Sequence, residues 1–138
     1  AGAHIIGTGR ATHRDAARDL GVHKFVDLDG ELLEDVGEVD AVLDVIGGDI
    51  RDRSTALLRP GGTLVTITDP PTIHPHDGRA IFFVVEPNRE QLAQLATRLH
   101  DRRLIPLVNA VRPLADAPAA FSPEGRTRGR TIIKVTTD

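Results

Sequence analysis

The chain has 138 residues, of which 40% are apolar and 27% are charged, and this fits one globular domain with a single core rather than a disordered segment. A formal net charge of −3 gives no broad positive field for a nucleic-acid backbone, and the absence of cysteine excludes disulfides and cysteine-ligated zinc. No apolar run approaches the length of a membrane span and no signal segment opens the chain. We therefore predict a cytoplasmic protein that binds neither membrane nor nucleic acid.

Short apolar runs alternate with helical patterns in the first part of the chain. We predict strands over residues 4–7 and 24–27. The helix between them would begin near Thr12 and end at Gly21. Its inner face would carry Ala16, Ala17 and Leu20. A short acidic helix over residues 31–36 leads to the next strand.

Residues 40–67 form the most informative segment. Two unbroken apolar runs, 41–46 and 63–68, are typical of strands that are buried on both faces of a parallel sheet. A helix lies between them, for which Asp49 is a candidate cap and which the Pro-Gly-Gly sequence at 60–62 would end. The predicted inner face of this helix carries Ile50, Ser54, Leu57 and Leu58.

The second half repeats the alternation after a proline-rich loop over residues 69–78. We predict strands over 80–85, 107–111 and 131–135 and a short helix over 113–121. The strongest helical pattern begins after Asn88, its expected cap, with Gln91 placed for a reciprocal bond and with Leu92, Leu95 and Leu99 facing inward. Strands that alternate with helices predict right-handed crossovers and a three-layer, doubly wound parallel α/β sheet.

The end of the first strand suggests a preference for NADP over NAD. In dinucleotide-binding folds an acid at this point binds the ribose 2′-hydroxyl of NAD, whereas arginine accommodates the 2′-phosphate of NADP. This chain offers Arg10 and Arg14 and has no acid before Asp15. The alternative is that both arginines are merely solvated residues at a helix start.

Asp44 lies inside an apolar strand, where an ionised carboxylate needs nearby donors. It would either accept backbone amides from the turn at Gly47 and Gly48 or lie near a ribose hydroxyl at the strand's carboxyl end. The six histidines are dispersed, and we interpret His74, His76 and Asp77 as loop residues rather than metal ligands. Neither serine lies in a nucleophile elbow, which disfavours a hydrolase.

The chain resembles the medium-chain dehydrogenase/reductase superfamily, and within it the NADPH-dependent quinone oxidoreductase-like branch. Five segments occur in the order that is typical of this superfamily, namely residues 1–8, 20–27, 40–48, 58–65 and 128–133. The resemblance implies a Rossmann-like domain that takes part in the reduction of a quinone, an enone or a related carbonyl compound, in which hydride passes from the nicotinamide.

The resemblance also implies a set of cofactor-binding residues, whereas it implies no catalytic residue and no metal ligand in this chain. The adenosine 2′-phosphate would meet Thr8, Arg10, Thr12, His13 and Arg14. The dinucleotide would pass Ile46 and Gly47, and the nicotinamide would lie near Ile67, Thr68, Phe83 and Val84. Arg130 stands where the superfamily usually has a lysine near the cofactor.

Relative to that superfamily, the first strand, the glycine-rich loop and the amino-terminal catalytic domain are missing. We therefore expect a fragment without reductase activity of its own. Residues 1–103 would form an incomplete dinucleotide-binding domain, and residues 104–138 would return to the catalytic domain. The exposed edge left by the missing strand predicts a homo-oligomer. The alternatives are a domain similar to methyltransferases that use S-adenosylmethionine, and a non-enzymatic nucleotide-binding module.

Overall fold

The computed structural model describes residues 2–122 and 129–136. These residues fall into two compact units, Ala1–Val85 and Glu86–Asp138, which are each described by themselves. The division lies in front of the long helix of the second half, whereas the boundary expected from the sequence follows that helix. Within the described ranges, no helix is long and apolar enough to span a bilayer.

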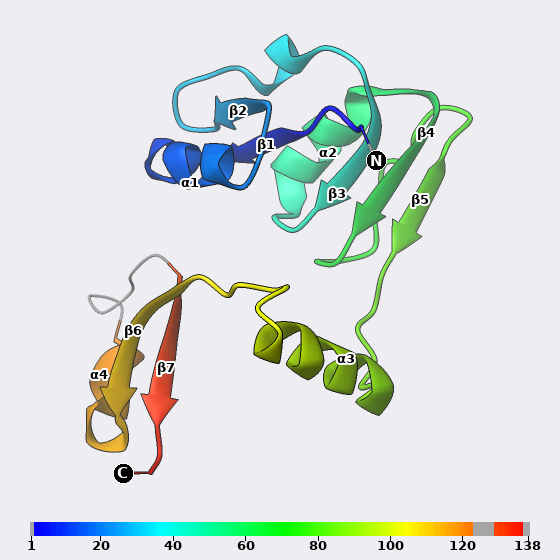
Figure 1. The fold of residues 1–138 in the computed structure, drawn as a ribbon. Helices are drawn as coiled ribbons and strands as arrows, with labels where there is room; N and C mark the ends of the chain where they lie inside the picture. The colour runs from blue at the N-terminus through cyan, green and yellow to red at the C-terminus, as the bar shows by residue number, and fades with distance from the viewer. Residues whose placement is uncertain (1, 123–128, 137–138) are drawn as a thin grey trace. The chain divides into compact units, whose positions relative to one another are not determined.

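Helices or 3₁₀ segments separate most consecutive strands of both units, whereas a loop joins β4 to β5 (Figure 1). The first unit contains β1 (Ile6–Gly9), α1 (Arg14–Asp19), β2 (Lys24–Asp27), β3 (Val39–Asp44), α2 (Gly48–Ala56), β4 (Leu58–Thr66) and β5 (Arg79–Phe82). It also has two short 3₁₀ segments, Ala11–His13 and Leu33–Val36. The second unit contains α3 (Arg89–His100), β6 (Val108–Pro113), a 3₁₀ turn (Leu114–Asp116), α4 (Ala117–Ala120) and β7 (Arg130–Lys134).

Every strand pair in the described parts of the chain is parallel. In the first unit β1 pairs with β2, and β3, β4 and β5 form a second sheet in that order. In the second unit β6 pairs with β7. The parallel α/β class predicted from the alternating pattern is therefore confirmed, although the hydrogen-bonded strands fall into three sheets and not into one continuous sheet.

The buried apolar residues of the first unit come from β2, the 3₁₀ segment Leu33–Val36 and β4, and α2 packs against β3 and β4 (Figure 1). The register places Asp44 opposite Thr66, and both side chains are buried on one face of the β3–β4–β5 sheet together with Leu64. The opposite face carries Leu43, which is 71% exposed, and Ile81. The β3 strand is thus buried on one face within this unit, not on both as its apolar sequence predicts.

The prediction that Pro60–Gly62 ends the helix is wrong. Helix α2 ends at Ala56, and β4 already begins at Leu58. The Pro-Gly-Gly sequence lies inside β4, at a shift of register between β3 and β4, and Gly61 has a positive φ of 81°. A glycine is needed there because L residues rarely adopt that backbone conformation.

Three predicted helix features differ and one is confirmed. Asp49 is not the cap of α2, because the cap position is taken by Gly47 and no side chain caps the helix there. Leu20, expected to face inward, is exposed, since α1 already ends at Asp19. Asn88 does cap α3, with its side-chain oxygen accepting the Gln91 amide at 3.0 Å. The leucines of that helix, which we expected to face inward, are exposed: Leu92, Leu95 and Leu99.

Candidate functional site

The carboxyl ends of β3 and β4 are joined by a buried carboxylate. Oδ1 of Asp44 accepts the backbone amides of Ile46 and Gly47 at 3.1 and 2.9 Å. Its Oδ2 accepts the hydroxyls of Thr66 at 2.7 Å and Thr68 at 3.2 Å. The predicted bonds from the glycine turn are therefore confirmed, and the two threonine bonds are an addition that the sequence did not indicate.

The four hydrogen bonds keep Asp44 ionised. Burial opposes the charged form, but the donors from Gly47, Thr66, Ile46 and Thr68 outweigh it and hold the pKa of Asp44 below its ordinary value. The Asp44 carboxylate thus holds the turn after β3 and the end of β4 in fixed positions. Both lie at the carboxyl edge of the sheet, where parallel α/β folds bind ligands.

Gly47 is tightly enclosed by the segment that follows β4. It is buried and has a φ of 81°. A Cβ at this position would lie 2.9 Å from Oγ1 of Thr68 and 3.1 Å from Oδ1 of Asp69. Only glycine therefore allows the turn after β3 to approach the turn after β4 this closely.

A buried cation holds the same segment from the helix side. Arg51, in the first turn of α2, has a side chain that is only 4% exposed. Its Nη1 donates to Oδ2 of Asp69 at 2.6 Å, and its Nε donates to Asp52 at 3.0 Å. The hydrogen bond from Arg51 holds the pKa of Asp69 below its ordinary value. The sequence did not indicate Arg51, because its partner Asp69 comes from the segment after the next strand.

At the end of β1 the two predicted arginines differ in their surroundings. Arg14 donates to Glu31 at 2.6 Å and to the Phe25 carbonyl at 3.2 Å, and its guanidinium lies 5.2 Å from the centre of the Phe25 ring. Arg10 is exposed and directly follows β1. An acid that the sequence reasoning did not consider also lies here, because Asp27 accepts the Ala11 amide at 3.1 Å.

The other predicted residues of the first unit follow the strand ends. Thr8 is exposed in β1, and Thr12 and His13 lie in the 3₁₀ segment after it. Exposed apolar side chains lie at or just beyond the carboxyl ends of β3, β4 and β5: Ile46, Ile67, Phe83 and Val84. The Phe83 amide donates to the Thr66 carbonyl at 2.8 Å. Arg130, in the other unit, is the first residue of β7.

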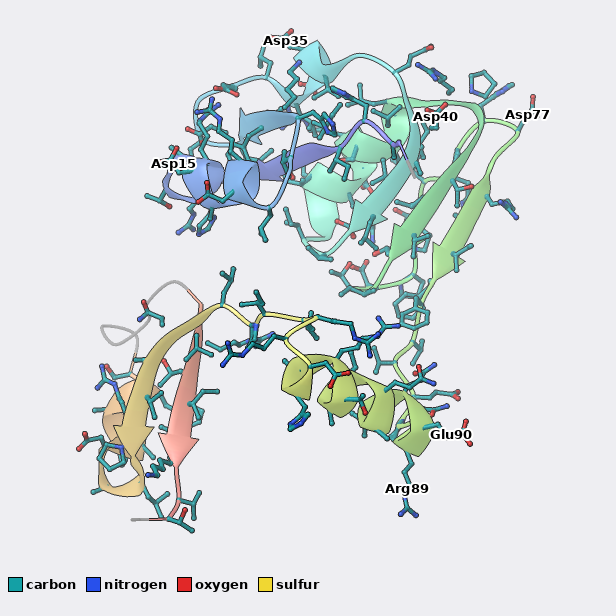
Figure 2. The ribbon with its side chains drawn as sticks, viewed as in Figure 1. Asp15, Asp35, Asp40, Asp77, Arg89 and Glu90 are labelled. Carbon is teal, nitrogen blue, oxygen red and sulfur yellow. The ribbon has the colours of Figure 1, made fainter. Side chains whose placement is uncertain are left out.

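The loop histidines do not form a metal centre. Nδ1 of His76 lies 3.2 Å from Oδ2 of Asp77, and both side chains are exposed. The Asp77 side chain points outward from the connection between β4 and β5 (Figure 2). Among the described residues there is no group of three or more acidic or histidine side chains that could hold a metal ion. These residues therefore do not fit a zinc site.

Parallel strands joined by helices, with a glycine turn and polar groups at their carboxyl ends, define a nucleotide-binding type of α/β domain. The sequence model of the family described as zinc-binding dehydrogenase matches residues 20–133. The chain belongs to this dehydrogenase family, which confirms the resemblance found in its sequence. A search of curated proteins gave no match.

Solved structures share the fold. A quinone oxidoreductase from Coxiella burnetii aligns with a TM-score of 0.77 and 24% identity, over 95% of this chain and 44% of its own. An alcohol dehydrogenase superfamily protein from Novosphingobium aromaticivorans aligns with a TM-score of 0.75 and 21% identity, over 98% of this chain and 49% of its own. A Bacillus thuringiensis protein assigned as an NADPH:quinone reductase aligns with a TM-score of 0.71 and 22% identity, over 95% of this chain and 48% of its own. The chain therefore spans less than half the length of these proteins and has the Rossmann-like fold of their superfamily.

Proposed function

We propose that this chain is the cofactor-binding part of an NADPH-dependent oxidoreductase that reduces a quinone, an enone or a related carbonyl compound. The observation that carries the proposal is the carboxyl edge of the β3–β4–β5 sheet. There the exposed side chains of Ile46 and Ile67 stand beside a glycine turn that Asp44 holds in place. An apolar surface next to fixed backbone suits a flat nicotinamide ring.

When bound, NADPH supplies the hydride, and the residues of this chain bind and orient the cofactor. Ile46 and Gly47 would line its path, and Ile67, Thr68 and the backbone of Phe83 and Val84 would face the nicotinamide. Since the chain spans less than half of the structures that it resembles, reduction is proposed for a protein in which this domain works beside a substrate-binding domain. The chain alone is expected to bind cofactor without turning over substrate.

The preference for NADPH is proposed to depend on Arg10. This residue is exposed and follows β1 directly, where a guanidinium can pair with the two oxygens of a 2′-phosphate. Thr8, Thr12 and His13 are proposed to complete the phosphate site. Arg14 is proposed to have a supporting role, because Glu31 and Phe25 already accept hydrogen bonds from its guanidinium. In the second unit, Arg130 is proposed as a further contact to the cofactor.

Adenosine 2′,5′-bisphosphate and adenosine 5′-monophosphate test this assignment, because they differ only in the 2′-phosphate. Titrations of the labelled chain followed by NMR should give tighter binding of the bisphosphate. The Arg10→Glu variant should lose about tenfold or more of that affinity, since a charge-assisted hydrogen bond contributes about 1.5 to 3 kcal/mol. Binding of the monophosphate should change little.

The matched control is Arg18→Glu, which makes the same change of charge on the exposed surface of α1. It should leave the ratio of the two affinities unchanged. Equal affinities of the unmutated chain for the two nucleotides would refute the proposed role of Arg10. The absence of any binding of NADPH and NADH would refute the proposed cofactor function of this chain.

A further inference from the structure

The segment that follows β4 is held from two sides. On the strand side, the Thr68 hydroxyl donates to the carboxylate of Asp44. On the helix side, Asp69 accepts Nη1 of Arg51 at 2.6 Å, and its backbone carbonyl lies 3.5 Å from the same nitrogen. The two residues in the middle, Thr68 and Asp69, are also the ones that would contact a Cβ at Gly47.

We propose that Arg51 is a positioning residue that fixes the segment 67–69 against Gly47 and thereby shapes the nicotinamide end of the cofactor site. The inference rests on the proposed function for its link to the cofactor. The Arg51 side chain is almost fully buried, so it acts through Asp69 and not by contact with the nucleotide.

The energetics of the pair favour a positioning role over a stabilising one. A buried guanidinium must be desolvated, and replacement of a whole buried ion pair by apolar side chains is often neutral or even stabilising, whereas removal of one partner is costly only where the remaining charge is buried. Asp69 is about half exposed and would regain water if its partner were removed. The pair does fix the orientation of Asp69. The planar guanidinium of Arg51 donates to the side chain of Asp69 and to that of Asp52, the next residue in α2, and its flat shape sets the direction of both bonds.

Hydrogen exchange of two amides provides the direct test. The amide of Ile67 donates to the Asp44 carbonyl at 3.2 Å, and that of Thr68 donates to the Thr66 hydroxyl at 3.4 Å. Both bonds require the segment to stay in place. In the Arg51→Met variant, which keeps length and helix propensity but removes the charge, exchange of both amides should be about tenfold faster because the segment opens locally. The temperature of global unfolding should not fall.

The matched control is Arg53→Met in the same helix. Arg53 pairs with Glu34 at 2.7 Å, away from Asp69, so its loss should leave exchange at residues 67 and 68 unchanged. The Arg51→Lys variant keeps a charge that can reach Asp69 and should restore part of the protection. Unchanged exchange in Arg51→Met, or an equal increase in Arg53→Met, would overturn the positioning role.

Saturation-transfer NMR with NADPH then tests the link to the cofactor. In the Arg51→Met variant the signals of the nicotinamide protons should fall relative to those of the adenine protons, and the dissociation constant for NADPH should rise about fivefold, since the loosened segment has to be ordered when the cofactor binds. An unchanged ratio and affinity, with faster exchange, would overturn that link. If the unmutated chain binds no NADPH, the proposed function fails, whereas the exchange comparison still decides the role of Arg51.

Discussion

Removal of the Asp44 carboxylate should be the most damaging single change at the edge of this sheet. In Asp44→Ala two buried donors, the Gly47 amide and the Thr66 hydroxyl, lose an ionised acceptor. Hydrogen bonds to charged groups contribute about 1.5 to 3 kcal/mol each, so the loss would total about 3 to 6 kcal/mol. The Thr66 hydroxyl can turn to Thr68, which lies 3.0 Å away, and this places the expected cost near the lower end.

Urea unfolding measures this cost. The chain contains neither tryptophan nor tyrosine, so far-UV circular dichroism is the practical probe, with NMR amide signals from β3 and β4 to report on the first unit alone. The Thr66→Val variant offers a graded comparison, since it removes one of the four donors and keeps the shape of the side chain. It should cost about 1 to 2 kcal/mol.

The same network predicts a dependence on pH. The pKa of Asp44 is lowered on folding, so its contribution is complete above the pKa of the unfolded chain, about 3.9, and is lost as the pH falls below that value. Asp44→Asn should flatten this part of the stability profile. If Asp44→Ala costs less than about 1 kcal/mol at neutral pH, then the carboxylate is not what holds the turns together, and the reasoning from buried donors is wrong.

Two further predictions concern the surface of the first unit. The bidentate pair with Arg53 lowers the pKa of Glu34 to about 2, so the contribution of this pair to stability should vanish as the pH falls from about 4.5 towards 2. A carbon NMR titration should show this low pKa for Glu34, and an ordinary pKa would contradict the pair. Every described strand except β4 has one edge without a strand partner, so we expect the chain to associate with itself. Light scattering should show a mass that rises with concentration, and the Leu43→Lys variant should associate less.

Local patterns were sufficient to predict the elements whose signal is local. The strand Lys24–Asp27 and the Asn88 cap of α3 follow from a few adjacent residues, and both are confirmed. The Pro-Gly-Gly sequence misled because its usual role as a helix terminator was assumed. Here β3 pairs with β4 on both sides of the Pro-Gly-Gly sequence, which is left as a bulge within β4. This pairing depends on residues of β3 that lie about twenty positions earlier in the chain.

The interior of α2 could not be predicted for a similar reason. A helical period based on apolar residues selects Ile50, Ser54 and Leu57, whereas the buried residues are Arg51 and Thr55. A buried arginine is acceptable only with a partner, and that partner, Asp69, is supplied by the segment after the next strand. No pattern within the helix contains that information.

The site therefore combines one part that the sequence predicts and one that only the tertiary arrangement reveals. Asp44 is a local feature, a carboxylate in an apolar strand followed by two glycines, and its amide bonds follow from that context. The burial of Arg51 is not a local feature, yet both side chains hold the segment after β4, Asp44 through Thr68 and Arg51 through Asp69.

The two side chains differ in what their loss leaves behind. Loss of Asp44 leaves buried donors without an acceptor and should lower stability. Loss of Arg51 leaves two carboxylates, Asp69 and Asp52, that are both within reach of water, and it should loosen one segment without unfolding the unit. Comparison of the two variants by stability and by exchange thus separates what holds this fold together from what orders the carboxyl edge of its sheet.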